Sequence, residues 1–284
     1  MARLAWRSET ARRHHATPWR YVAHAATLAP LLALLIASTA ASAQQACRQA
    51  LLLGLDVSLS VDPVEFGLQR TGLARALTSA TVAEAILPRG GAHVELAVFE
   101  WSGPFDQQPL VGWTVIDSRA TLARLARRLV EAPQEARLGK TGLGAAMRHA
   151  RRSLGSRAHC ARLTLDLSGD GPSNSGPLPE AVKPEMEAAG ITVNGLVIGI
   201  DPFATGSGEV DVIGLARYYD EKVITGPAAF VEAVIGFEGY QAAMERKLLR
   251  ELTPSYAHAA PPRPARLALA LDIATDMQPG PRRN

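Results

Sequence analysis

Short runs of consecutive apolar residues alternate along the chain with longer stretches in which apolar residues recur every three or four positions. The short runs predict β-strands. Three of them are apolar at successive positions, which is typical of strands covered on both faces. The predicted strands are Ala50–Asp56, His93–Trp101, Leu110–Ile116, Arg162–Leu167, Thr192–Ile198 and Lys222–Thr225.

The longer stretches predict amphipathic helices between these strands. The first has a well-marked start, because Asp62 can cap it, Pro63 suits its first turn and Glu65 completes a capping box. Pro184 lies inside a later helix and weakens that prediction. The predicted helices are Asp62–Ser79, a helix capped by Ser118 with Leu122, Leu125 and Leu129 on one face, Thr141–Leu154, Leu178–Ala189, Asp211–Tyr219 and Ala228–Leu252.

Alternating strands and helices predict an α/β fold, with a doubly wound, mostly parallel sheet and helices on both faces. The link between His93–Trp101 and Leu110–Ile116 is nearly direct, so we expect Leu110–Ile116 to be one short antiparallel edge strand. In such sheets, ligands bind at the carboxyl ends of the strands, where the strand order reverses.

The two ends of the chain differ from this pattern. Residues 1–43 carry five arginines before an apolar segment that ends in Ala41-Ser42-Ala43, which is typical of a secretory signal cleaved after Ala43. The alternative is a membrane anchor, but the apolar core is shorter than the ~20 residues that span a bilayer. We therefore expect a folded domain at 44–252 in a periplasmic or secreted protein. The Pro- and Ala-rich residues 253–284 predict a disordered tail.

Removing the signal changes the charge of the chain. The whole chain has a net charge of +3, but residues 1–43 contain five arginines and one glutamate. The mature protein therefore carries about −1, and its basicity is a targeting feature. No later Lys/Arg cluster interleaves with aromatic residues, so we expect no nucleic-acid partner and no membrane span after cleavage.

Hydroxyl and carboxylate side chains follow the predicted strands. Asp56, Ser58 and Ser60 form a D-x-S-x-S run at the end of the first strand, and Asp170 follows the fourth. Thr141 lies where a loop meets a helix. Because the first and fourth major strands are neighbours in a doubly wound sheet, these five side chains should converge, and oxygen ligands suit Mg²⁺. The alternatives are that Ser58 and Ser60 cap the first helix or satisfy loop backbone groups, that Thr141 caps a helix, and that Asp170 lies in a turn.

The two cysteines test the same strand register. Cys47 lies nine residues before Asp56, and Cys160 lies ten before Asp170. If the two strands are parallel neighbours, both sulfurs lie together at the opposite edge of the sheet, within the separation that a disulfide accepts. An exported protein favours a Cys47–Cys160 disulfide; the alternative is two buried free thiols.

With these residues in place, the chain resembles von Willebrand factor type A (VWA) domains that carry a metal-ion-dependent adhesion site, and more closely the DUF1194 family of exported bacterial proteins. The resemblance covers residues 48–252. The matching segments are 55–58, 99–103, 113–117, 168–174, 190–196, 217–219 and 223–227.

The resemblance implies a divalent cation, Mg²⁺ or Mn²⁺. Ser58, Ser60 and Thr141 would be direct ligands, and Asp56 and Asp170 would act directly or through water. A protein partner that presents Asp or Glu would supply the last ligand. Leu59, a large side chain between the two serines, and Pro184 depart from the family pattern, and each could alter access to the site.

Three functions follow from these residues. The first is a non-enzymatic binding module, favoured because the sequence shows no G-x-S-x-G elbow and no nucleophile–base pair. The second is a metal-dependent phosphohydrolase with Asp56 as its nucleophile, although Ser58 stands where such enzymes have a second acid. The third is a VWA scaffold whose metal site is vestigial.

Overall fold

The computed structural model describes residues 46–133, 139–201 and 211–253. The predicted signal at 1–43 and the predicted tail beyond Thr253 lie outside these ranges. Within them, no helix combines the length and the apolarity that crossing a membrane requires.

Six strands form one sheet in the order β3-β2-β1-β4-β5-β6. All neighbouring pairs are parallel except β2–β3, so the predicted antiparallel edge strand is confirmed. The strands are β1 (Ala46–Asp56), β2 (Ala92–Trp101), β3 (Gln107–Ile116), β4 (Leu163–Gly169), β5 (Ile191–Gly199) and β6 (Val231–Ile235).

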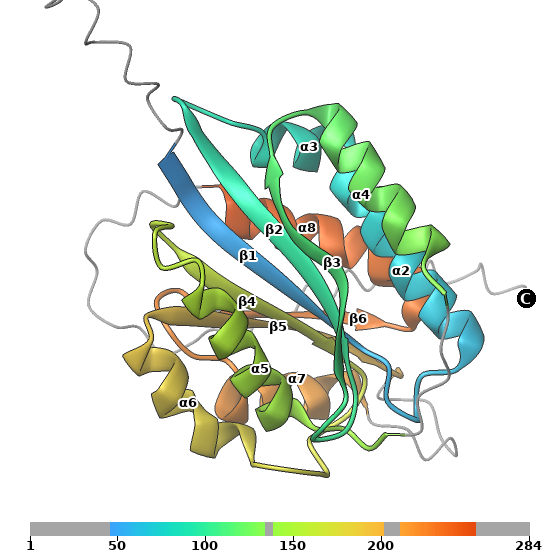
Figure 1. Ribbon diagram of the computed structural model, residues 1–284. Helices are drawn as coiled ribbons and strands as arrows, with labels where there is room; N and C mark the ends of the chain where they lie inside the picture. The colour runs from blue at the N-terminus through green and yellow to red at the C-terminus, as the bar shows by residue number, and fades with distance from the viewer. Residues whose placement is uncertain (1–45, 134–138, 202–210, 254–284) are drawn as a thin grey trace, which may run out of the picture. The chain divides into compact units, whose positions relative to one another are not determined.

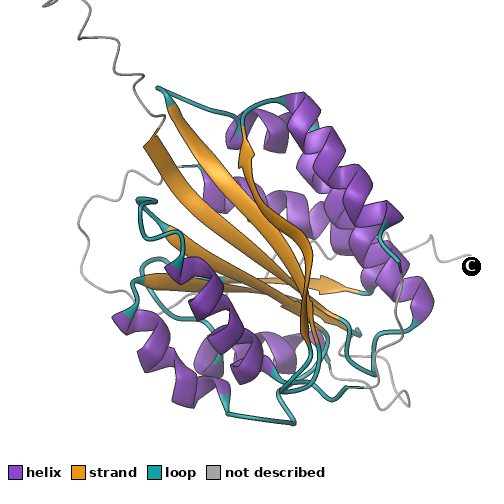
Figure 2. Cartoon of the chain, viewed as in Figure 1, coloured by secondary structure: helices purple, strands orange, loops and turns teal. Residues whose placement is uncertain are grey.

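Helices cover both faces of the sheet, as predicted (Figures 1 and 2). One face is covered by α2 (Pro63–Thr78), α3 (Ala80–Ile86), α4 (Arg119–Glu131) and α8 (Tyr240–Leu252). The other is covered by α5 (Leu143–Gly155), α6 (Pro179–Ala188) and α7 (Val212–Lys222). Pro184 lies inside α6, which continues past it.

The continuous apolar run of β1 is explained by this arrangement. Leu51, Leu53 and Leu55 point into the core beneath α2 and α8, while Leu52 points into the core beneath α5. Successive strand residues face opposite sides, so a strand buried on both faces needs apolar residues at every position.

Two predictions at the C-terminal end are wrong. Lys222–Thr225 is not a strand, since Thr225 forms only an isolated bridge to Val193. Instead β6 lies within the segment 228–252 that was predicted to be helical, followed by the short 3₁₀ helix η2 (Phe237–Gly239). Gly236, at φ +68°, ends β6 before the chain turns into α8. The helix α3 beyond Ser79 was also not predicted.

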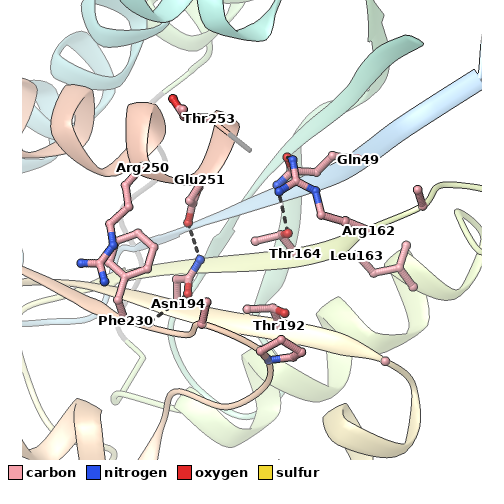
Figure 3. A pocket seen from close by; sticks show the side chains of 14 residues that line it. Gln49, Arg162, Leu163, Thr164, Thr192, Asn194, Phe230, Arg250, Glu251 and Thr253 are labelled. Atoms are coloured by element: carbon pink, nitrogen blue, oxygen red, sulfur yellow. Dashed lines mark hydrogen bonds between the residues drawn. The ribbon is translucent and has the colours of Figure 1, made fainter. Parts of the chain in front are cut away.

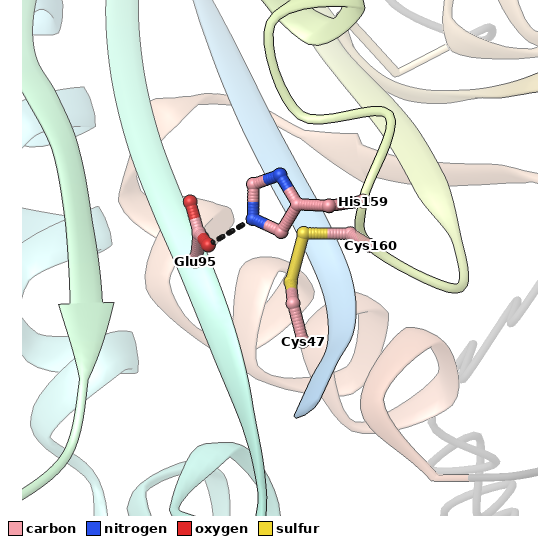
Figure 4. Close-up of side chains that lie close together, drawn as sticks. All are labelled: Cys47, Glu95, His159 and Cys160. Atoms are coloured by element: carbon pink, nitrogen blue, oxygen red, sulfur yellow. Dashed lines mark hydrogen bonds and ion pairs between the residues drawn. A yellow bond between two sulfur atoms is a disulfide. The ribbon is translucent and has the colours of Figure 1, made fainter. Parts of the chain in front are cut away.

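The predicted disulfide is present between Cys47 and Cys160, whose Cα atoms lie 4.5 Å apart (Figure 4). It follows from the pairing of β1 with β4, in which Leu55 lies opposite Ser168. Beside it, the buried carboxylate of Glu95 pairs with His159 at 2.7 Å and with Arg157 at 2.9 Å. Both cysteine sulfurs are committed to each other, so this cluster fastens the loop before β4 to strands β1 and β2.

The disulfide generates a stability prediction. The paired variant C47A/C160A should lose up to about 4–5 kcal/mol of unfolding free energy, because the bond closes a long loop. Urea denaturation measures the loss. Adding a reductant should destabilise the native protein by a similar amount and leave the variant unchanged. Equal stability of the two proteins would contradict a structural role for the bond.

A buried charged cluster joins α8 to the middle of the sheet. Lys247 is fully buried. It contacts the carboxyl group of Asp166 of β4 and forms an ion pair with Glu251 at 2.8 Å. Asn194 donates to the same Glu251 oxygen at 2.6 Å. Burial and the neighbouring Glu251 raise the pKa of Asp166 to about 8.

Asp166 should therefore make folding stability pH-dependent. Between its unfolded pKa of 3.8 and its folded pKa of about 8, the native state holds a proton that the unfolded chain has lost. Its contribution is fully present below pH 3.8 and is lost as the pH rises through 8. Asp166→Asn removes this titration, so the unfolding free energy should depend less on pH across that window. An unchanged slope in chemical denaturation would contradict the assignment.

Candidate metal centre

The end of β1 holds Asp56 in a loop whose backbone is fixed on several sides. Gln69 of α2 donates to the Asp56 carbonyl at 3.0 Å, and the Ser58 amide donates to Asp56 Oδ1 at 2.8 Å. The Leu59 amide donates to the Gly139 carbonyl at 3.0 Å. The chain that follows β1 is therefore tied to α2 and to the loop that precedes Thr141.

The structure brings together all five side chains that the sequence singled out. Ser58 Oγ lies 3.3 Å from Ser60 Oγ and 3.4 Å from Thr141 Oγ1. The Ser60 hydroxyl donates to Asp170 Oδ1 at 2.9 Å. Asp56 joins the group through its bond to the Ser58 amide. Oxygens from three separate loops thus meet at the carboxyl edge of β1 and β4.

The hydroxyl groups do not cap helices. Asp62 caps α2, and α5 begins at Leu143 after Gly142, with no side-chain cap. Thr141 is instead fixed by Asn174, whose side chain accepts from the Thr141 amide and whose amide donates to the Thr141 carbonyl, both at 2.9 Å. The capping alternatives for Ser58, Ser60 and Thr141 are therefore wrong, and these hydroxyls point to one another across the loops.

Asp56 carries the electrostatic character of the site. Its side chain is buried, and its Oδ2 has no hydrogen-bond partner within the described part of the chain. Burial, and secondarily the nearby Asp170, raise the pKa of Asp56 well above its ordinary value. A buried carboxylate with an unpaired oxygen is costly unless a cation or a donor compensates it. The all-oxygen set around it is the one that hard divalent cations prefer, so these residues fit such an ion.

Two further residues, Gly169 and Tyr219, lie close to the Asp56 carboxylate. A Cβ atom at Gly169 would overlap the Tyr219 hydroxyl and lie 3.1 Å from Asp56 Oδ2. Tyr219 is fully buried, and burial followed by the charge of Asp56 raises its pKa well above the ordinary value. Only glycine therefore leaves room for the Asp56 carboxylate and the Tyr219 ring to approach β4.

Some of these supporting residues were missed by sequence reasoning. Gln69 lies in a helix with no motif of its own. Asn174 and Tyr219 lie in segments that match the family, but the sequence assigned neither of them a role at the site. The one available signal was the pair of glycines around Asp170, since glycine often marks a close approach of neighbouring groups.

A pocket of about 480 Å³ lies at the edge of the sheet opposite to the oxygen cluster (Figure 3). The polar side chains of its floor are bonded to one another: Gln49 donates to Thr164 and accepts from Arg162, and Asn194 bonds Glu251. On its wall Arg250 stacks on the Phe230 ring at 3.9 Å. We assign this network to structure, because Arg162, Gln49 and Thr164 are linked by hydrogen bonds and Asn194 bonds Glu251.

With the fold and the site described, comparison with known proteins defines the class. Residues 46–256 match the family described as "Protein of unknown function (DUF1194)", and the chain belongs to that family. Its fold is that of von Willebrand factor type A domains. A comparison with curated proteins found no significant match.

Solved structures share this fold at low sequence identity. Proximal thread matrix protein 1 from the mussel byssus, solved with a zinc-occupied MIDAS motif, matches with a TM-score of 0.52 and 17% identity, over 74% of this chain and 48% of that one. The pilus adhesin SpaC from Lactobacillus rhamnosus GG, in an open conformation, matches with a TM-score of 0.51 and 14% identity, over 74% and 30%. This chain spans about half the length of the mussel protein.

Gly169 provides a test of the site's architecture. Gly169→Ala should lower the unfolding free energy by about 1–3 kcal/mol, because the added methyl group forces the Tyr219 ring and the Asp56 carboxylate apart. Gly171→Ala, two residues further on in the loop after β4, is the matched control, since a Cβ atom there meets no described residue within 4 Å. Equal stability of the two variants in urea denaturation would contradict the close approach.

Proposed function

We propose that this protein is a binding module that holds Mg²⁺ or Mn²⁺ and engages a protein partner through an acidic side chain. The observation that carries the proposal is the meeting of five oxygen-bearing side chains around a buried carboxylate that has one unpaired oxygen. The residues that would hold the ion are Asp56, Ser58, Ser60, Thr141 and Asp170.

The donor set explains why an acidic partner would bind. Three of the five side chains are neutral hydroxyls, so the protein supplies at most two negative charges to a divalent ion. The ion would provide electrostatic attraction for a further carboxylate. Asp56 is oriented by the Ser58 amide, and Asp170 accepts from the Ser60 hydroxyl. Such contacts hold hydroxyl ligands in position.

Hydroxyl and carboxylate oxygens favour hard cations over softer ones. Magnesium also keeps several waters and is usually held by one or two carboxylates, which agrees with the two aspartates here. Support by likeness comes from the mussel matrix protein, whose MIDAS motif contains zinc, and from the pilus adhesin that shares the fold.

The structure argues against Asp56 as the nucleophile of a phosphohydrolase. The Asp56 residue is 1% exposed, and one of its carboxylate oxygens accepts from the Ser58 amide. A nucleophile must reach its substrate directly, and the carboxylate of a residue that is 1% exposed is poorly placed to do so.

We further propose that the protein works in the periplasm or outside the cell. The predicted signal at 1–43 supports export, and the Cys47–Cys160 disulfide suits an oxidising compartment.

Calorimetric titration of Mg²⁺ and Mn²⁺ into the chelator-treated mature protein tests the metal site. We expect one site, lost in Asp56→Ala and weakened about tenfold or more in Thr141→Val, because a metal ligand is removed. Thr121→Val is the matched control, since Thr121 is equally buried but lies on α4.

The titration is repeated with excess acetate, which stands in for the partner's carboxylate. Tighter Mg²⁺ binding in acetate would support the acidic partner. Absence of metal binding under both conditions would reject the proposed function and leave a VWA scaffold with a vestigial site.

A further inference from the structure

Phe105 is the most exposed large apolar side chain among the described residues, at 98% exposure. It lies at the tip of the turn between β2 and β3, and that turn is rigidly bonded. The Ser102 hydroxyl donates to Asp106 Oδ2 at 2.6 Å, the Ser102 amide donates to the Asp106 carbonyl at 3.0 Å, and Gln107 donates to the Gly103 carbonyl at 2.8 Å. The ring is therefore held in solvent by a fixed backbone.

The turn that carries Phe105 packs against the candidate metal centre. The Gly142 amide, one residue beyond Thr141, donates to the Ser102 carbonyl at 2.7 Å. A Cβ atom at Gly139 would lie 2.7 Å from the Gly103 amide, so the two loops are in close contact. The position of Phe105 is thus coupled to the loop that presents the Thr141 hydroxyl.

Two other exposed apolar side chains, Leu59 and Leu178, lie on segments close to the Gly139 loop or to the Phe105 turn. Leu59 is 69% exposed between Ser58 and Ser60, and its amide bonds the Gly139 carbonyl. Leu178 is 55% exposed and lies two residues after Gly176, where an added Cβ atom would be 3.1 Å from Pro104, the neighbour of Phe105. We call Leu59, Phe105 and Leu178 the apolar rim.

On its other side, the candidate centre opens into a pocket of about 310 Å³. Its lining includes Ser60, Thr141 and Asp170, together with the exposed Pro172 and the half-buried Ile200. Accessible apolar surface therefore adjoins the oxygen cluster at the rim and, through Pro172 and Ile200, in the pocket. Exposed apolar patches next to a polar site are typical of protein-binding surfaces, and exposed aromatic residues are frequent energetic anchors there.

We propose that the apolar rim and this pocket form one docking surface for a protein segment in which an acidic side chain is flanked by apolar side chains. The acidic side chain would meet the metal and its neighbours would pack on Phe105, on Leu59 and in the pocket. This inference rests on the proposed function. A membrane surface is a poorer occupant, because Glu65 and Asp170 beside the pocket repel anionic headgroups.

The test uses short random peptides displayed in a library and selected on the mature protein in Mg²⁺, with elution by chelator. Enriched peptides are synthesised, and their affinities are measured by fluorescence anisotropy for the native protein, Phe105→Ser and Val130→Ser. Val130 is the matched control, since it is 53% exposed on the helix α4. Calorimetry measures Mg²⁺ affinity for each variant separately.

We expect enriched peptides to carry Asp or Glu beside apolar residues. Phe105→Ser should weaken peptide binding about tenfold or more, since a buried Phe contributes that much. The Mg²⁺ affinity of Phe105→Ser should stay unchanged. The Val130→Ser protein should bind the peptides as tightly as the native protein does. Chelator-released peptides that bind Phe105→Ser as tightly as the native protein would overturn the docking surface and leave the metal function standing. Recovery of no such peptide by a protein that binds Mg²⁺ would overturn it as well.

Two other results separate the two proposals. Peptides that stay bound through the chelator step are recovered afterwards with acid. If these depend on Phe105 and bind equally well in chelator, they would support the apolar surface and reject the metal-mediated function. Sedimentation in Mg²⁺ that shows a dimer of the native protein, dissociated by Phe105→Ser, would identify a second copy of this chain as the occupant and overturn the foreign partner.

Discussion

The parallel pairing of β1 with β4 is the constraint on which the rest of the structure depends. With Leu55 opposite Ser168, the two strands end together and release Asp56 and Asp170 at one edge of the sheet. The same register brings Cys47 and Cys160 within bonding distance at the other edge. A slip of one residue would turn every side chain of β1 to the wrong face, and the disulfide opposes such a slip. The bond that stabilises one edge therefore also fixes the geometry of the candidate centre at the other.

That centre combines a buried carboxylate, which is energetically unfavourable, with hydrogen bonds that fix the backbone around it. Asp56 has lost its solvent and keeps one oxygen without a hydrogen bond, which is unfavourable in a protein interior. The fold tolerates this because the surrounding backbone is fixed independently: Gln69 holds the Asp56 carbonyl, Asn174 holds Thr141 and Gly169 leaves space for the carboxylate. A site that is organised before its ligand arrives loses little entropy when the ligand binds.

Sequence patterns predicted the parts of this arrangement that depend on local chemistry and strand register. Apolar runs predicted five of the six strands and the helices that cover both faces of the sheet. Residue spacing predicted the disulfide and the convergence of the five oxygen-bearing side chains. The pattern failed at β6, because a five-residue edge strand beside Gly236 carries too short a signal against the long apolar segment around it. It also missed Asn174 and Tyr219, whose roles arise from contacts over long sequence separations, such as that of Asn174 with Thr141.

The loops around the candidate metal centre show how stability and recognition depend on different residues of one chain. The core does not depend on the tips of these loops, since neither of its two clusters includes Leu59 or Phe105. Leu59 and the Phe105 turn are held instead by backbone hydrogen bonds and by the side chain of Ser102. Their own apolar side chains contribute nothing to that bonding, so they are free to differ without altering the fold. Selection for a partner can therefore act on these positions alone, while the hydroxyls and carboxylates between them keep a common chemistry.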